Sequence, residues 1–229
     1  MNIPKLLKHE LTFPNPEDAN EDGIVAWGGD LSPSRLIRAY QNGIFPWYGK
    51  NDPIIWWSTD PRLIMELNDL KISRSLKKSM KKFDYKFDSD FKEVIKNCSS
   101  VKRETQDGTW IQEEIIEAYT VLHDMGVAHS VESYKDGKLA GGLYGIVVGK
   151  IFCGESMFSF VNDASKAAYA VLVKHLKFWG YDFIDCQVPT RHLKSLGAKE
   201  VSRRYFLDRL YKTHVDTVDH KWKIEDSLL

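Results

Sequence analysis

The sequence has few cysteines and no long apolar run. Cys98, Cys153 and Cys186 are odd in number and show no C-x-x-C spacing, which argues against a disulfide framework and favours a reducing compartment. No apolar run approaches the roughly 20 residues of a membrane-spanning helix. Residues 1–10 also lack the continuous apolar core of a signal peptide. We therefore expect a cytoplasmic protein, and no ligand spacing calls for a metal or another cofactor.

The sequence also lacks an excess of charge of either sign. Its 32 basic and 32 acidic side chains cancel, so the net charge neither favours nor excludes a nucleic-acid partner, and only local clusters are informative. With 229 residues, 43% of them apolar and 12% aromatic, the chain can bury the core of one large domain or two modest ones.

Residues 13–62 are rich in glycine, proline and aromatic residues, which is incompatible with a long regular element. One helix is expected within them, because Ser32 is a candidate N-cap, Pro33 suits the first helical position and Gly43 can end the helix. We therefore predict a small irregular N-terminal domain over residues 1–62.

The pattern after residue 127 is that of strands and helices in turn. Asp136-Gly137 is a hairpin signal between two strand-like runs. The elements expected are strands over 128–134, 139–148, 151–160 and 181–188, a helix from about 163 to 179, a short helix over 191–196, and a last strand and helix over 199–213. This order predicts an α+β fold with a mixed, mainly antiparallel sheet. Over residues 63–229 it resembles the N-acetyltransferase-like (GNAT-like) fold, so we expect a domain of that kind there.

Three polar residues stand inside runs that otherwise read as buried strand. Glu155, Asp185 and Gln187 have mostly apolar neighbours in sequence, and burying a carboxylate without a partner costs several kcal/mol or raises its pKa. A pocket would explain them. The alternative is that the carboxylates are structural and pair with a base such as Lys166 or Arg191.

Residues 72–87 predict a helix with one basic and one apolar stripe. The basic stripe consists of Arg74, Lys77, Lys78, Lys81 and Lys82. It is typical of a solvated surface, but like charges at helical spacing repel, so unpaired positive charges also suggest a polyanionic partner.

Several short motifs identify the chain further when they are taken together. They are Gly28-Gly29-Asp30-Leu31-Ser32-Pro33, Gly43-Ile44-Phe45-Pro46-Trp47, Trp56-Trp57-Ser58 with Asp60-Pro61-Arg62, Ser73-Arg74-Ser75, Gly108-Thr109-Trp110-Ile111, Ala128-His129-Ser130-Val131-Glu132, Gly154-Glu155-Ser156-Met157-Phe158-Ser159 and Ile184-Asp185-Cys186-Gln187. In this order, from about Phe13 to Phe206, the sequence resembles the bacterial leucyl/phenylalanyl-tRNA–protein transferase family.

The resemblance implies an enzyme that moves Leu or Phe, with Met as a further candidate, from its tRNA to the N-terminal Lys or Arg of an acceptor protein. The product would enter the N-degron (N-end rule) route of degradation. Family members need no cofactor, and we expect a monomer that does not bind membranes. The catalytic residues implied are Asp185, Gln187 and Glu155. Our hypothesis is that Asp185 polarises Gln187, whose amide oxygen accepts a hydrogen from the attacking amine, while Glu155 binds the cationic acceptor terminus.

The family correspondence also implies a pocket for the amino-acid side chain. Its residues would be Trp47, Trp110, Phe152, Leu176 and Ile184, and Leu176 stands where well-known members carry Phe. Strand alternation conflicts with part of this set, because it directs Asp185 and Gln187 to one face and turns Ile184 to the other. The tRNA would bind the basic stripe of Arg74, Lys77, Lys78, Lys81 and Lys82.

Three other functions remain open at this point. Gly154-Glu155-Ser156 is similar to a nucleophile elbow, although Phe158 replaces its closing glycine, and Cys186 with His192 or His129 could form a thiol dyad. A coenzyme-A acetyltransferase is suggested by the expected fold, but no pyrophosphate-binding glycine turn is evident. The basic stripe alone would also suit a tRNA-binding module without enzymatic activity, and for His129 a structural role is the simpler reading.

Overall fold

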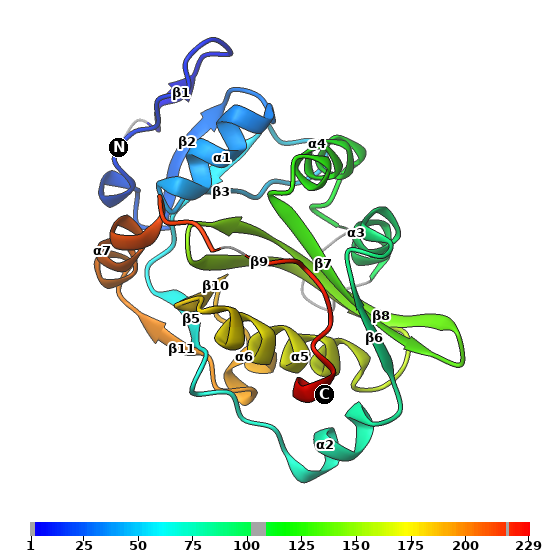
Figure 1. Ribbon diagram of the computed structural model, residues 1–229. Helices are drawn as coiled ribbons and strands as arrows, with labels where there is room; N and C mark the ends of the chain where they lie inside the picture. The colour runs from blue at the N-terminus through cyan, green and yellow to red at the C-terminus, as the bar shows by residue number, and fades with distance from the viewer. Residues whose placement is uncertain (1–2, 102–108, 219) are drawn as a thin grey trace.

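The computed structural model describes residues 3–101, 109–218 and 220–229. It contains a four-stranded sheet in the order β1-β2-β4-β3 and a seven-stranded sheet in the order β11-β5-β10-β9-β8-β7-β6. The α+β class, the mixed sheet and the small N-terminal part are therefore confirmed (Figure 1).

The N-terminal part is built on the smaller sheet and one helix. Its elements are β1 (Lys5–Leu6), the 3-10 helix η1 (Pro16–Asp18), β2 (Ile24–Gly28), α1 (Pro33–Gln41), β3 (Phe45–Pro46) and β4 (Ile55–Trp57). The helix begins at Pro33 as predicted, but the Ser32 side chain forms no cap hydrogen bond. Instead, Asp30 accepts from the Ser32 N–H and pairs with Arg35.

The larger sheet contains all five predicted strands. Its members are β5 (Arg62–Glu66), β6 (Asp84–Phe87), β7 (Ala128–Lys135), β8 (Lys138–Val148), β9 (Ile151–Ser159), β10 (Phe183–Gln187) and β11 (Lys199–Val201). The predicted antiparallel run β7-β8-β9 is confirmed, with Asp136 and Gly137 at positive φ in the hairpin turn. β10 lies parallel to β9, which makes the sheet mixed.

Helices cover both faces of this sheet. They are α2 (Arg74–Met80), α3 (Phe91–Ser100), α4 (Glu113–Asp124), α5 (Ala164–Trp179), α6 (Arg191–Ser195), α7 (Arg203–Thr213) and the 3-10 helix η2 (Asp226–Leu228). α5 and α2 belong to the apolar core of one face, and α1, α3, α4 and α7 to the core of the other (Figure 1). α5 ends at Gly180 (φ 84°), as the sequence predicts.

The helix predicted over residues 72–87 is wrong in its second half. α2 ends at Met80, and residues 84–87 form β6, which pairs antiparallel with β7. Phe83 and Phe87 are both buried, but a spacing of four places two side chains on one side of a helix and equally on one face of a strand. Pairing with β7 decides between the two.

Candidate functional site

A cavity opens where two neighbouring strands separate. β9 and β10 pair only through Ile151–Cys153 and Phe183–Asp185. Beyond this register, residues 154–163, which include the rest of β9, and residues 187–190, at and after the end of β10, line a cavity of about 1040 Å³. The separation thus creates an opening in the sheet that is large enough for an amino-acid side chain and part of the molecule to which the amino acid is attached.

Four of the five residues predicted for an apolar pocket line this cavity. They are Trp47, Trp110, Phe152 and Ile184. Leu176 does not line it: this residue is fully buried in α5, and Leu172, one helical turn earlier, lies on the wall instead. Leu176 therefore lies behind the cavity wall, and any effect of that residue on the cavity passes through its neighbours.

The strand alternation predicted around Asp185 is broken. The register of β10 shifts between Asp185 and Gln187, and Gln187 has a φ of 59°. Because of this bulge, Ile184 and Gln187 both line the cavity, whereas Asp185 does not. Positive φ is uncommon for a residue other than glycine and costs on the order of 1 kcal/mol or more, so neighbouring groups must stabilise Gln187 in this conformation.

Asp185 forms a buried ion pair with Arg62. The two carboxylate oxygens lie 2.8 and 2.7 Å from Nε and Nη2 of Arg62, and both side chains are 1% exposed. Asp185 Oδ1 also accepts the backbone N–H of Gln187 at 2.9 Å. The Asp185 carboxylate thus has the contacts expected of a structural ion pair, but its partner is Arg62 and neither Lys166 nor Arg191.

The Arg62 guanidinium is fixed by aromatic rings as well. It lies 4.9 Å from the ring centre of Phe45 and 4.4 Å from that of Phe206, distances that allow cation–π attraction. The sequence offered a signal for Arg62, since this residue ends the Asp60-Pro61-Arg62 motif, but only the fold brings it to Asp185.

Glu155 and Gln187 meet across the two separated strands. Gln187 Nε2 donates to Glu155 Oε1 at 2.6 Å, and the Tyr119 hydroxyl donates to Oε2 at 3.4 Å. The Tyr119 hydroxyl lies 2.5 Å from that of Tyr40, so a pair of buried phenols lies behind the Glu155 carboxyl group. Burial raises the pKa of Glu155 to about 7, although its hydrogen bonds with Gln187 and the tyrosines oppose the shift. Such a group can take up and return a proton near neutral pH.

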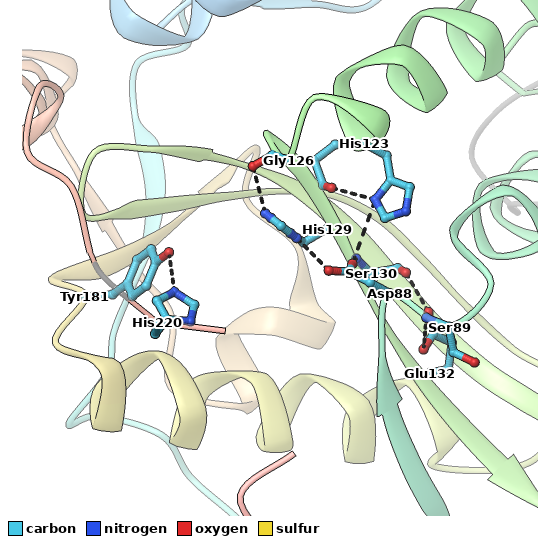
Figure 2. Close-up of polar contacts among 10 residues, drawn as sticks. Asp88, Ser89, His123, Gly126, His129, Ser130, Glu132, Tyr181 and His220 are labelled. Atoms are coloured by element: carbon cyan, nitrogen blue, oxygen red, sulfur yellow. Dashed lines mark hydrogen bonds and ion pairs between the residues drawn. The ribbon is translucent and has the colours of Figure 1, made fainter. Parts of the chain in front are cut away.

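Within the described part of the chain, no activated cysteine lines the cavity. Cys186 lines it, but burial raises the pKa of this thiol to about 12, so the nucleophilic thiolate is disfavoured. His129 is engaged elsewhere, with Nδ1 2.7 Å from Asp88 Oδ2 (Figure 2). The described residues also contain no group of three or more His, Cys, Asp or Glu side chains that could hold a metal ion.

The basic residues are exposed near the cavity. Arg74, Lys77 and Lys78 lie on α2, followed by Lys81 and Lys82. In the described part of the chain none of the five forms an ion pair with an acidic side chain. Ser79 of the same helix donates to Asp163, which lines the cavity. This hydrogen bond connects α2, which carries three of the basic residues, to the lining of the cavity. Gly108, part of another predicted motif, lies outside the described residues.

The fold and the site together define a class of protein. A cavity whose lining is partly apolar, with a carboxyl and a carboxamide at its wall and no activated thiol among the described residues, suits a transferase that binds an apolar acyl group. Among the described residues, no helix has the length and apolar composition of a membrane span.

Sequence comparisons give the family. The model of the leucyl/phenylalanyl-tRNA protein transferase family matches residues 64–211, and that of its N-terminal domain matches residues 29–60. The chain is similar to the leucyl/phenylalanyl-tRNA–protein transferases of Sulfurimonas denitrificans (77% identity, 97% of each chain) and Maridesulfovibrio salexigens (54%, 92% of this chain and 88% of the relative). The chain belongs to the leucyl/phenylalanyl-tRNA protein transferase family.

Similarity to solved structures is weak. A conserved protein of unknown function from Staphylococcus epidermidis aligns with a TM-score of 0.40 and 10% identity, over 78% of this chain and 68% of that one. L-PGS from Bacillus licheniformis aligns with a TM-score of 0.36 and 12% identity, over 77% and 61%. Neither is close enough to assign the fold.

Proposed function

We propose that the protein transfers Leu or Phe from aminoacyl-tRNA to the N-terminal Lys or Arg of acceptor proteins and so marks them for N-degron degradation. The observation that carries this proposal is the apolar cavity with Glu155 and Gln187 at its wall, in a chain of this family. The apolar wall formed by Trp47, Trp110 and Phe152 suits a Leu or Phe side chain and would disfavour a charged one.

The chemistry needs little more than positioning and one proton acceptor. An aminoacyl ester is already activated, and well-oriented reactants gain roughly 7–11 kcal/mol in favourable cases. The acceptor amine attacks the ester carbonyl, a C–N bond forms, and the C–O bond to the tRNA ribose breaks. Glu155, with its raised pKa, takes the proton from the amine and returns it to the leaving ribose oxygen.

Gln187 orients the attacking amine in this scheme. Its Nε2 donates to Glu155, and its amide oxygen accepts no hydrogen bond within the described residues, so this oxygen is available to the amine. Asp185 acts through Gln187: it accepts the N–H of that residue and is itself fixed by Arg62. We therefore keep Gln187 as the residue that orients the amine, propose Glu155 as the general base in place of the cation-binding role expected from the family, and propose Asp185 as a positioning residue.

The proposed activity is tested by transfer of radiolabelled Leu from tRNA to a peptide that begins with Arg. We expect labelled peptide with Leu-tRNA and Phe-tRNA, and none with Ala-tRNA, because alanine would leave the apolar cavity unfilled. A peptide that begins with Asp serves as the control acceptor. Absence of label in the Arg peptide with both charged tRNAs would contradict the proposal.

The basic residues on and after α2 are proposed to contact tRNA phosphates. The triple charge reversal Lys77→Glu, Lys78→Glu and Lys81→Glu should raise the KM for tRNA at least tenfold. It should also flatten the plot of log KM against log salt by roughly 0.7–0.9 per lost contact. Lys138→Glu, at the exposed β7–β8 turn, is the control and should leave both values unchanged. An unaltered salt slope in the triple variant would refute this placement.

Four broader expectations also remain proposals. A division near residue 62 is supported by the smaller sheet, which ends with β4, and by the separate family matches to residues 29–60 and 64–211. The separation of the parallel pair β9 and β10 supports a GNAT-like catalytic part. A cytoplasmic location follows from the proposed tRNA substrate, and light scattering will test the expected monomer.

A further inference from the structure

The described residues of the C-terminal tail, 214–218 and 220–229, cross the face of the larger sheet that also carries α5 (Figure 1). It lies beyond residues 64–211, which the family model matches. Lys174 of α5 donates to the Leu228 carbonyl at 2.7 Å, and His175 accepts the Glu225 N–H at 2.9 Å. Hydrogen bonds with two side chains of α5 thus fix the end of the tail.

A second attachment lies nearer the middle of the tail. The Tyr181 hydroxyl is 3.0 Å from His220 Nε2, as Figure 2 shows, and the His220 ring stacks on Trp179 with a centroid distance of 4.2 Å. These contacts fix the tail on both sides of Trp222, because His220 precedes it and Glu225 follows it.

Trp222 links the tail to the wall of the cavity. Its ring stacks on His129 at 3.9 Å with an interplanar angle of 12°, and it lies 6.0 Å from the Phe152 ring, centre to centre. His129 is a rigid support, because its two ring nitrogens lie 2.7 Å from Asp88 Oδ2 and 3.2 Å from the Gly126 carbonyl (Figure 2). The indole is therefore fixed on one side by His129 and contacts Phe152 on another.

Phe152 is the wall residue that Trp222 reaches. It is fully buried and lines the cavity. Its ring covers Gly145 of β8 so closely that a Cβ atom at Gly145 would lie 2.5 Å from Phe152 Cε1. Because Gly145 has no side chain, the Phe152 ring can lie directly against its backbone. Trp222 lies beside this ring and can keep it in that position.

We propose that Trp222 is a positioning residue that sets the amino-acid preference of the cavity through Phe152. The inference rests on the proposed aminoacyl transfer. Removal of the indole would leave space beside Phe152, and its ring could move away from the cavity. A wider cavity makes fewer contacts with the small Leu side chain, whereas the larger Phe side chain still fills it.

The test compares kcat/KM for Leu-tRNA and Phe-tRNA in substituted proteins of full length. Trp222→Ala should lower the Leu/Phe ratio about tenfold, mainly through a higher KM for Leu-tRNA, since lost ground-state contacts raise KM. Trp222→Phe retains an aromatic contact and should keep the ratio within twofold of wild type. Trp222→Leu fills the sheet face without a flat ring and should lower the ratio about threefold.

Two controls separate this effect from a loosened tail. Lys174→Met removes the contact with Leu228, and Val215→Ala alters an exposed tail residue; both should keep the wild-type ratio. If Trp222→Ala does not fold, Trp222→Leu decides the question. A ratio within twofold of wild type in the folded Ala or Leu variant would overturn the inference, even if the melting temperature falls. Failure of the wild-type protein to transfer either amino acid would instead overturn the proposed function.

Discussion

Arg62→Met should destabilise the protein by about 3–5 kcal/mol and abolish transfer, because it leaves the Asp185 carboxylate buried without its cation. The loss would also free the chain around Gln187, whose backbone N–H is bonded to that carboxylate. Urea denaturation measures the stability, and the peptide-transfer assay measures the activity. Arg38→Met, on α1, removes an arginine that forms no ion pair in the described residues and serves as the control.

The double variant Arg62→Met, Asp185→Asn separates the charge of Asp185 from its geometry. Asparagine removes the uncompensated charge but keeps an oxygen that can accept the Gln187 N–H. If Asp185 only positions Gln187, the double variant should recover most of the stability lost in Arg62→Met and at least a tenth of the wild-type kcat. Recovery of stability without recovery of kcat would show that the carboxylate itself takes part in the reaction.

Glu155→Gln should lower kcat by about 10²–10⁴, the usual contribution of a general base. The wild-type kcat at saturating peptide should rise with pH around a midpoint near 7, because the base form of Glu155 appears as its carboxyl loses its proton. The variant should lack this rise. Glu113→Gln, which alters an exposed carboxylate at the start of α4, is the matched control and should retain both rate and pH profile.

Stability gives a second measure of the same group. The pKa of Glu155 is raised from its ordinary value to about 7, so the folded state binds the proton more tightly than the unfolded state. The protein should therefore lose stability as pH rises through about 4.5 to 7, and Glu155→Gln should abolish this part of the loss. If the melting temperatures of wild type and variant follow parallel curves between pH 5 and 8, the assignment of a raised pKa is wrong.

Elements with strong local signals were predictable from the sequence. The Asp136-Gly137 turn and the stop at Gly180 both depend on positive φ, which these residues adopt at low cost, and both signals are confirmed. α3 and α4 were not predicted. Neither Asp90 nor Gln112 forms a side-chain cap hydrogen bond at their starts, although Val94, Ile95 and Cys98 at helical spacing could have revealed α3.

The sequence predicted which residues belong to the site better than it predicted the contacts between them. Family motifs placed Glu155 and Gln187 together, and the structure shows that they touch. The bulge that separates Asp185 from Gln187 depends on pairing with β5, which no local pattern indicates. The Arg62 partner could not be inferred from spacing either, because the two residues lie far apart in the chain and meet only when β5 and β10 pair.

The stack of Phe45, Arg62 and Phe206 bears on how such proteins can be recombined. Its rings come from β3 in the N-terminal part and from α7 near the other end of the chain, and the cation between them holds Asp185. A chimera that joins the first 60 residues of one relative to the remainder of another would therefore inherit the stack from two parents. Such exchanges should work only where Phe45 from one parent packs well against Arg62 and Phe206 from the other. The first 60 residues and the remainder of the chain are therefore expected to change together in evolution.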